Sequence, residues 1–316
     1  KTNVLHYVIV QQLQTISVVC VAKGFFNSFP CVFPLTTISI SVEFTNITSL
    51  CNGSLSALPF LKELHLSSNA LHSLPNHFPH PLSHLHTIDL TNNFIKSVSP
   101  TLFLDTPALR SLVLKGNLLS KLWVSKVPIL ERLEWLDLSE NNITTLNPLS
   151  FYSFHNLENI DLSYNQIQEL PPSLLKAFPL LQRLNLEGNN LTSLPSSVFT
   201  GTPFLKHVYL GKNSLHFLPE RLFLPIISLK TLDLSDNQLS RLPPGLLQEA
   251  RGLGEKMEQS LDLSYNPWHC DCHLLSMHLW VSKHISSFYS INNTKCAKPA
   301  TLENYTLYQV TQTELC

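Results

Sequence analysis

The amino-acid sequence predicts an α/β solenoid, a right-handed horseshoe in which short parallel strands form a sheet on the concave side and cysteine-stapled caps close both ends. Three observations predict it. Leucines recur in the same pattern every 24 residues, and one asparagine recurs in phase with them. Cysteines are absent between Cys51 and Cys270, so they gather at the two ends of the repetitive stretch, as expected of capped solenoids.

Each repeat follows the pattern L-x-x-L-x-L-x-x-N-x-L. In the repeat that begins at Leu181, Leu184 and Leu186 alternate as in a strand, so both side chains point to one side. Asn189 stands where the chain must turn, and its amide can donate to and accept from backbone groups of its own turn and the next. The period lies within the roughly 20–29 residues of leucine-rich repeats, which predicts a stack with one continuous core.

The in-phase positions run without a gap through eight repeats. The first leucines are Leu61, Leu85, Leu109, Leu133, Leu157, Leu181, Leu205 and Leu229, and the asparagines are Asn69, Asn93, Asn117, Asn141, Asn165, Asn189, Asn213 and Asn237. Because these positions recur at one fixed spacing, the pattern predicts one parallel strand for each repeat, with the strands in chain order.

Three regions follow from this pattern. We expect an N-terminal cap over residues 1–36, about ten repeats over 37–266 and a cysteine-rich C-terminal cap over 267–316. The first repeat is atypical, because Thr45 stands at the asparagine position. The last is atypical as well: Asn266 follows Asn237 by 29 residues, which predicts five extra residues bulging near Leu253–Ser260.

The seven cysteines predict disulfides and hence an oxidising compartment. In the N-terminal cap we expect Cys20 to pair with Cys31, which leaves Cys51 as the odd cysteine, either buried and free or bridged to another chain. In the C-terminal cap we expect Cys270–Cys296 and Cys272–Cys316, out of the three pairings that four cysteines allow. The segment from Leu274 to Val281 reads as a short amphipathic helix that covers the last repeat.

Composition restricts the class of protein further. Charged residues make up 14% of the chain and the formal net charge is −1, so no overall basic field points to nucleic acid. No apolar run approaches the ~18 residues of a membrane span. The chain starts at Lys1 without a signal-like segment, which we interpret as a mature secreted chain.

No motif predicts catalysis or a metal. The sequence lacks the nucleophile elbow, the zinc-protease motif, the P-loop and the dinucleotide fingerprint. The run HCDCH at His269–His273 resembles a metal site, but its place in the cap and the two later cysteines favour disulfides. The histidines between His77 and His86 lie in a loop without nearby carboxylates. We therefore expect no enzyme, no cofactor and no metal.

Six N-x-S/T sequons predict glycosylation of a secreted chain. They are Asn46, Asn52, Asn142, Asn190, Asn292 and Asn304. Asn142 and Asn190 each follow an in-phase asparagine and occupy the same outward position of the repeat, so we expect most of these sites to carry glycan. Unmodified asparagine is the better interpretation for Asn52, beside Cys51.

The concave face is the candidate binding site, formed by the third, fifth, seventh and eighth residue of each repeat. Nine acids on this face outnumber Lys115, Arg183 and Lys212, which gives about −6 on a nearly neutral chain, and four aromatic residues accompany them as anchors. The predicted binding residues are Glu63, Asp89, Trp135, Asp137, Glu140, Asp161, Tyr164, Glu187, Tyr209, Asp233, Asp236, Asp262 and Tyr265. Such a face should attract a basic protein, although the recurrent aspartate also suits a purely structural role in the repeat.

Several segments resemble a known family. The 24-residue repeats, VEFTNIT at 42–48, LKELHLSSNAL at 61–71, and the ending from NPWHCDC to NNTKCAKP resemble the leucine-rich alpha-2-glycoprotein family, and most of all its branch of beta-type serum phospholipase A2 inhibitors. The resemblance covers residues 38–316. It implies a secreted plasma glycoprotein without catalysis that neutralises a basic protein, most of all a basic phospholipase A2, by steric masking.

Other functions stay open at this stage. The alpha-2-glycoprotein branch implies a binder of cytochrome c, another basic protein, or of a growth factor, and Cys272 with Cys316 is a second closing pair that this branch need not have. Repeats with cysteine caps also occur in the ectodomains of cell-surface receptors. A stalk and a membrane span after Cys316 would favour that class of protein. A matrix proteoglycan is disfavoured by the lack of a four-cysteine N-terminal cap. The sequence leaves homo-oligomerisation undecided.

Overall fold

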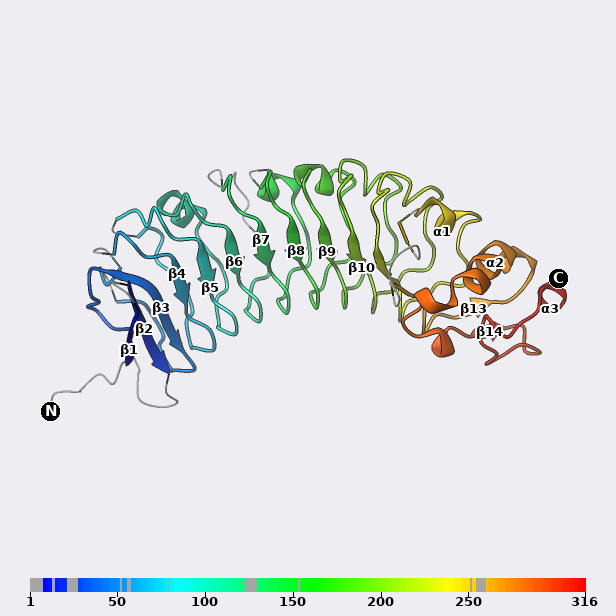
Figure 1. The fold of residues 1–316 in the computed structure, drawn as a ribbon, viewed down its shortest axis with the longest axis horizontal. Coiled ribbons are helices and arrows are strands. Elements are labelled where there is room, and N and C mark those ends of the chain that lie inside the picture. Colours follow the sequence, from blue (N-terminus) through cyan, green and yellow to red (C-terminus); the bar gives the residue numbers. More distant parts are fainter. Residues whose placement is uncertain are drawn as a thin grey trace. The chain divides into compact units, whose positions relative to one another are not determined.

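The structure is a computed structural model of the chain. It describes residues 8–12, 15–21, 28–51, 53–55, 58–78, 80–122, 130–152, 154–250, 252–253 and 260–316. The chain forms two compact units. Unit 1 comprises residues 1–143 and 147–157, and unit 2 comprises residues 144–146 and 158–316. Figure 1 shows that the strands of each unit lie side by side in chain order.

Unit 1 is built on one sheet. Its strands are β1 (Val8–Gln12), β2 (Thr15–Val21), β3 (Thr37–Glu43), β4 (Glu63–His65), β5 (Thr87–Asp89), β6 (Ser111–Val113) and β7 (Trp135–Asp137). From β2 onward each strand pairs in parallel with the next, and only β1 is antiparallel to its neighbour. Short 3-10 helices lie in the returning segments, η1 at Pro100–Asp105 and η2 at Pro148–Phe151.

Unit 2 continues the same construction and then changes. Its parallel strands are β8 (Asn159–Asp161), β9 (Arg183–Asn185), β10 (His207–Tyr209), β11 (Thr231–Asp233) and β12 (Leu261–Asp262), with η3 (Leu174–Ala177) and α1 (Leu246–Glu249) in the returning segments. After them come β13 (Trp268–His269), η4 (Cys272–Leu274), α2 (Leu275–Lys283), η5 (Ile285–Ser287), η6 (Ile291–Asn293), β14 (Cys296–Lys298) and α3 (Gln312–Leu315). The predicted strand in each repeat is thus confirmed.

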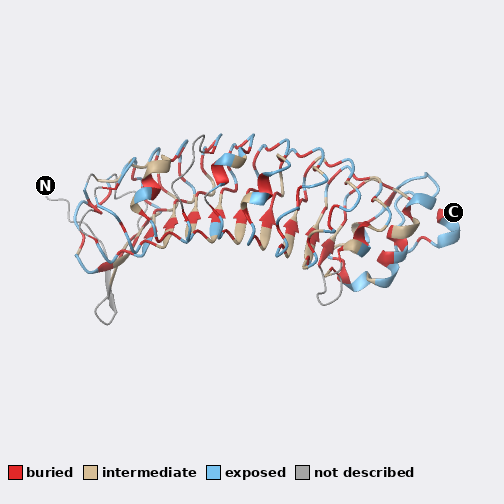
Figure 2. Ribbon diagram, turned by 90° about the horizontal axis from the view of Figure 1, so that it is seen from above, coloured by how far each residue is buried: buried red, intermediate tan, exposed pale blue. Residues whose placement is uncertain are grey.

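The core is a stack of leucines. From the β3 repeat to the β11 repeat, the first, fourth, sixth and eleventh residues are buried, for example Leu181, Leu184, Leu186 and Leu191 in the β9 repeat. Figure 2 shows buried residues along the strands and exposed ones in the connecting segments. Each Å² of apolar surface that is removed from water stabilises the fold by about 25 cal/mol. A single repeat cannot bury its leucines without a neighbouring repeat.

The in-phase asparagines tie successive repeats together. Asn189 Oδ1 accepts from the backbone N–H of Ile167 in the preceding repeat at 3.0 Å. Its Nδ2 donates back to the carbonyl of Leu162 at 2.9 Å and to that of Leu186 in its own turn at 3.1 Å. Asn93, Asn117, Asn141, Asn213, Asn237 and Asn266 repeat this arrangement. Each side chain therefore satisfies buried backbone groups that the turn leaves unpaired.

The first repeat uses threonine in this role. Thr45 is buried, and both its backbone N–H and its hydroxyl donate to Asn69 Oδ1, at 3.1 and 2.5 Å. Thr45 thus joins the first repeat to the second through Asn69. Ahead of it, β2 pairs with β3 and β1 pairs with β2, so these two strands extend the sheet beyond the first repeat.

The C-terminal segment differs from the repeats. Helix α2 buries Met277, His278, Trp280 and Val281, so the predicted amphipathic helix is confirmed. The insertion expected near Leu253–Ser260 falls largely on residues 254–259, outside the described residues. The predicted region borders at residues 36 and 266 stay predictions.

The cysteines correct one expectation. Cys31 is bonded to Cys51, so the expected Cys20–Cys31 pair does not form, and the odd cysteine is Cys20 and not Cys51 as expected. The reason is the alternation of β2: Cys20 lies opposite Val42 of β3 and both side chains are buried in the core, whereas Cys31 lies in an exposed loop. Burial raises the pKa of the Cys20 thiol, which keeps it protonated and unreactive.

The C-terminal pairs agree with the expectation. Cys270 is bonded to Cys296 and Cys272 to Cys316. The first pair joins the segment after β12 to β14, and the second fastens the last residue of the chain to η4. The disulfides therefore lie near the two ends of the chain, outside the regular repeats.

Replacing Asn189 with alanine should lower the free energy of unfolding by about 1–3 kcal/mol, because it leaves buried backbone groups without partners. Gln166→Ala, at an exposed position of the preceding repeat, is the control and should change stability by less than about 0.5 kcal/mol. Urea unfolding measures both variants, and equal stability of the two would contradict the role of the asparagine row.

Non-reducing peptide mapping should recover Cys31 joined to Cys51, and Cys20 should react with a thiol reagent only after unfolding. Closing a loop of this length contributes roughly 3 kcal/mol in the chain-entropy model, so Cys31→Ser should lower the melting temperature. Cys20→Ala should leave all three disulfides in place. Recovery of Cys20 in a disulfide with Cys31 would restore the first expectation and refute the observed pairing.

Candidate functional site

The candidate site is the sheet face, which we define in each unit as the third, fifth, seventh and eighth residues of its repeats. All thirteen predicted binding residues lie at these positions and all are exposed or half-buried. Unit 1 holds Glu63, Asp89, Trp135, Asp137 and Glu140, and unit 2 holds Asp161, Tyr164, Glu187, Tyr209, Asp233, Asp236, Asp262 and Tyr265.

The eighth residue of the repeat has an unusual backbone. Tyr164, Asp236 and Tyr265 adopt positive φ angles of 52°, 50° and 55°, in the left-handed region that few side chains occupy. The turn after each strand requires this conformation, and it projects the side chain from the strand's end. Gly188 stands at the same position in the next repeat, where a Cβ would come within 2.7 Å of the Tyr164 ring, so glycine makes room for that tyrosine.

The recurrent aspartate at the fifth position is partly structural. Asp137 Oδ1 accepts from the backbone N–H of Ser139 at 2.9 Å and from its hydroxyl at 2.6 Å. Asp89, Asp161 and Asp233 make the same pair of bonds to the residue two positions on, and Asp262 makes the backbone bond. One carboxylate oxygen thus fixes the turn, while the negative charge of the carboxylate remains on the sheet face.

In unit 1 a histidine lies among the acids. His65 Nε2 is 3.6 Å from Glu63 Oε2, and its Nδ1 is 4.0 Å from Asp89 Oδ2. The facing Asp89 carboxylate raises the pKa of His65 above its usual value, against the opposing effect of burial, and the charges of Glu63 and Glu43 add to the rise. Burial alone would raise the pKa of Asp89, but the facing His65 and the hydrogen bonds from Thr91 lower it.

Sequence reasoning missed Glu43 and His65. Glu43 is the seventh residue of the first repeat, so counting back 24 residues from Ser67 finds it. His65 occupies a fifth position, but a histidine carries no charge in a formal count. The count of charges from the sequence therefore lacks one acid in unit 1 and, below the pKa of His65, one positive charge.

Two further acids of the sheet face already have cationic partners. In unit 1, Lys115 Nζ lies 3.1 Å from Glu140 Oε1. In unit 2, Lys212 Nζ donates to Glu187 Oε1 at 2.7 Å and to the Tyr164 hydroxyl at 2.8 Å, and that hydroxyl donates to Glu187 Oε1 at 2.7 Å. Burial alone would raise the pKa of Glu187, but the bonds from Lys212 and Tyr164 lower it.

A second cation in unit 2 rests on an aromatic ring. The Arg183 guanidinium lies 4.3 Å from the centre of the Tyr209 ring, and Nη1 donates to the Tyr209 hydroxyl at 2.8 Å. The neighbouring Asn185 Nδ2 donates to Asp161 Oδ2 at 2.8 Å. Tyr164 and Tyr209 are thus held in place before any ligand arrives, which lowers the entropic cost of using them as anchors.

The remaining acids of unit 2 lie at β11 and β12. Burial raises the pKa of Asp233, and the nearby charges of Asp262 and Glu187 raise it further. Asp236 is exposed in the turn after β11. Like charges held this close together favour an incoming cation.

Five of the six sequons fall on described residues. Asn46, Asn142, Asn190, Asn292 and Asn304 are all exposed, whereas Asn52 lies outside the described residues. Asn46, Asn142 and Asn190 share the tenth position of their repeats, just after the asparagine row. Their glycosylation stays a prediction.

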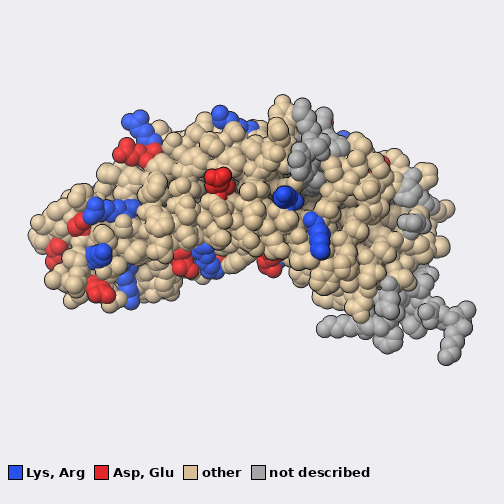
Figure 3. Space-filling view, turned by 180° about the vertical axis from the view of Figure 1, so that it is seen from behind, with Lys and Arg blue, Asp and Glu red and all other residues tan. Residues whose placement is uncertain are grey.

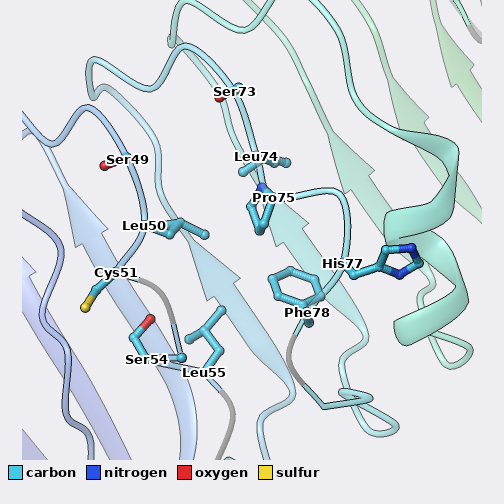
Figure 4. A pocket seen from close by; sticks show the side chains of 11 residues that line it. Ser49, Leu50, Cys51, Ser54, Leu55, Ser73, Leu74, Pro75, His77 and Phe78 are labelled. Atoms are coloured by element: carbon cyan, nitrogen blue, oxygen red, sulfur yellow. The ribbon is translucent and has the colours of Figure 1, made fainter.

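Unit 1 also contains a pocket of about 300 Å³ beside the Cys31–Cys51 disulfide. Figure 4 shows apolar side chains on its two sides, Leu50 and Leu55 facing Pro75 and Phe78. Ser54 Oγ lines it, buried and without a hydrogen-bond partner among the described residues. None of the described lining residues is Asp, Glu, Lys or Arg, and His77 turns toward η1. Its Nδ1 lies 3.3 Å from Asp105 Oδ2, so the expectation that this histidine has no nearby carboxylate is wrong.

Charge is sparse elsewhere, as Figure 3 shows from behind, where uncharged side chains cover most of the surface. Within the described ranges, no three His, Cys, Asp or Glu side chains are placed to hold a metal ion. His273 Nδ1 instead lies 3.3 Å from Asp271 Oδ1, and the two cysteines of HCDCH are in disulfides. Among the same residues, no helix is long and apolar enough to cross a membrane.

Curated relatives match short stretches of the chain. Phospholipase A2 inhibitor beta of Elaphe climacophora is 52% identical over 50 residues, 16% of this chain and 15% of the relative. A phospholipase A2 inhibitor of Gloydius brevicaudus siniticus is 50% identical over 50 residues, with the same shares. Human leucine-rich repeats and immunoglobulin-like domains protein 2 is 35% identical over 86 residues, 27% of this chain and 8% of that protein. Each match spans at most 15% of the relative's length.

Among solved structures, the crystal structure of the mouse RP105/MD-1 complex is similar with a TM-score of 0.72 and 23% identity, covering 87% of this chain and 46% of that chain. At this identity the likeness concerns the fold alone. The leucine-rich repeat family model matches residues 59–119, 83–133, 131–191 and 179–239, together more than half of the chain. The buried leucines, the parallel strands and the asparagine row agree with that match, and the chain belongs to the leucine-rich repeat family.

Proposed function

We propose that the chain is a secreted plasma glycoprotein that neutralises a basic protein, best a basic phospholipase A2, by covering it with the acidic sheet face. The observation that carries this proposal is the surplus of acids on the sheet face: with Glu43 included, acids exceed Lys and Arg by four in unit 1 and by three in unit 2. The matches to phospholipase A2 inhibitors of two snakes support the choice of partner.

The proposed mechanism is steric. The fifth-position aspartates supply negative charge, and Trp135 and Tyr265, exposed by 39% and 63%, offer apolar contact area. Aromatic residues of this kind often dominate binding, while surrounding charges set the association rate. The bound enzyme would lose access to its substrate, and no side chain of this chain performs chemistry. In this proposal the protein is therefore not an enzyme and needs no cofactor.

Secretion is part of the same proposal. Three disulfides need an oxidising compartment, and five described sequons lie on the surface where a glycan can be attached. A glycan at the tenth repeat position would leave the sheet-face positions free. We include blood plasma in the proposal because the chain resembles serum phospholipase A2 inhibitors, which would meet their target enzymes in the blood.

Changing Asp137, Asp161 and Asp233 together to asparagine should weaken binding to a basic phospholipase A2 at least about tenfold, or about 1.4 kcal/mol. The change keeps the turn, because Asn185 stands at the same repeat position and its Oδ1 accepts from Glu187 N–H at 3.1 Å. Surface plasmon resonance and an inhibition assay at low and high salt would measure the loss.

The control for that variant removes three charges elsewhere, with Glu131, Glu169 and Glu220, all exposed outside the sheet face, changed to glutamine. Binding by the parent should weaken as salt rises, since screening acts over ~8 Å at physiological ionic strength. If the aspartate variant and this control bind the enzyme equally well at every salt concentration, the sheet face is not the binding site.

Binding should also depend on pH through His65. As the pH rises through the raised pKa of His65, above about 6.5, the unit 1 face loses a positive charge and should bind a basic partner more tightly. His65→Gln should flatten this dependence, whereas His216→Gln, in an exposed loop, should not. Titration calorimetry between about pH 6 and 8 tests this, and an unchanged slope in His65→Gln would exclude the histidine.

A further inference from the structure

One edge of unit 2 combines exposed apolar side chains with lysines. Leu180, Phe204 and Ile227 are large apolar residues exposed by 39%, 53% and 63%. Lys206 and Lys230 immediately precede the third-position residues of β10 and β11. We call these five residues the amphipathic edge. They lie where the strands begin, whereas the aspartates of the sheet face lie where the strands end.

The repeat geometry places these side chains together. Lys206 N–H donates to the Gln182 carbonyl at 2.8 Å, and Lys230 N–H donates to the Lys206 carbonyl at 2.7 Å, so the second positions of three repeats form one row. Neighbouring strands of a sheet are about 4.8 Å apart. Leu205 is fully buried between Phe204 and Lys206, so these two side chains both project outward.

The charges around the edge are mostly positive. The third-position residues beside it are Arg183, His207 and Thr231, and none is acidic. Burial lowers the pKa of His207, and the charges of Arg183, Lys230 and Lys206 lower it further, which agrees with a cluster of cations. The acid in the row, Glu158, accepts a hydrogen bond from Gln182 at 2.9 Å, while Lys206 donates to Gln182 Oε1 at 2.7 Å.

We propose that the amphipathic edge binds the surface of an anionic phospholipid bilayer. Lysines near such a surface are attracted by its negative potential, and exposed aromatic and aliphatic side chains gain free energy by entering the boundary between headgroups and acyl chains. The edge presents both kinds of group side by side. This proposal concerns surface binding and uses other residues than the proposed neutralisation of a basic protein.

A bilayer suits the edge better than a sulfated polysaccharide or a nucleic acid. Those polyanions would pair with Lys206 and Lys230 but would leave Phe204 and Ile227 in water. A stacking platform for bases would need aromatic rings in succession, whereas Leu180 and Ile227 flank the one phenylalanine. Apolar side chains so exposed beside cations therefore favour a partner that is both negatively charged and apolar.

The corresponding edge of unit 1 is less suited to a membrane. Phe60 and Lys62 take the same positions there, but the repeat two further on has Ala108, which is buried, in place of a large apolar residue. Arg110 in that repeat is paired with Glu134 at 2.8 Å, which reduces its attraction for an anionic surface. The combination of apolar and cationic side chains is thus specific to unit 2 among these two edges.

The test is sedimentation of the full chain with vesicles. Vesicles of phosphatidylcholine with phosphatidylserine should bind the protein, and vesicles of phosphatidylcholine alone should bind it much more weakly. Because each lysine contributes about a fivefold gain near an anionic surface, Lys206→Gln with Lys230→Gln should lower the partition coefficient about 25-fold. Phe204→Ser with Ile227→Ser should also lower it at least about tenfold.

The control removes two charges elsewhere in unit 2, with Lys176→Gln and Lys283→Gln, both exposed, and should bind vesicles like the parent. Circular dichroism verifies that every variant is folded. Binding of the Lys206/Lys230 variant equal to that of the control would overturn the proposal. So would retention on a sulfated polysaccharide, unaffected by the Phe204/Ile227 changes, together with no binding to anionic vesicles. No phospholipase is present, so failure here leaves the proposed neutralisation untouched.

Discussion

The structure depends on one interaction, the hydrogen bonds that the in-phase asparagine makes to two repeats at once. At the turn after each strand the backbone must change direction, which leaves N–H and C=O groups inside the core without partners. An asparagine such as Asn189 supplies a donor and an acceptor from one side chain and joins its own turn to the turn before it. The leucines supply most of the burial energy, but this row sets the spacing at which they can stack. It also fixes the left-handed residue that precedes each asparagine and projects Tyr164 or Asp236 from the strand's end.

The regularity of the scaffold explains how charge is arranged in unit 2. Because every repeat presents the same position at the same place, the residues before the strands form one row and the residues after them form another. Lys206 and Lys230 belong to the row before the strands. Asp233 is the last residue of β11, and Asp236 belongs to the row after the strands. A three-residue strand is only about 10 Å long, so groups of opposite sign stay close without neutralising each other completely. The two proposals use these two rows separately, one for a basic protein and one for an anionic surface.

The sequence predicted the strands well because their cause is local and periodic. Leucine spacing and the asparagine row decide where each strand begins and ends, and both are visible in the letters. The cysteine pairing was predicted only in part: Cys20 has a partner-like spacing to Cys31, but its strand alternation buries it against β3, and that pairing of strands is not visible in the sequence. The sheet face was located by counting, yet the counting could not reveal its internal bonds. Lys212 reaches back a whole repeat to Glu187, and the raised pKa of His65 depends mainly on Asp89, one repeat further on.

The central claim is that the acidic sheet face holds a basic protein, and carboxyl footprinting of the complex tests it most directly. The protein would be labelled with a carbodiimide and an amine, alone and with a basic phospholipase A2, and each modified carboxyl would be located by mass spectrometry. The account predicts protection of Glu63, Glu140 and Asp236, which are exposed on the sheet face, with no change at Glu131, Glu169 and Glu220. Protection of the latter three with undiminished labelling of the sheet face would contradict it.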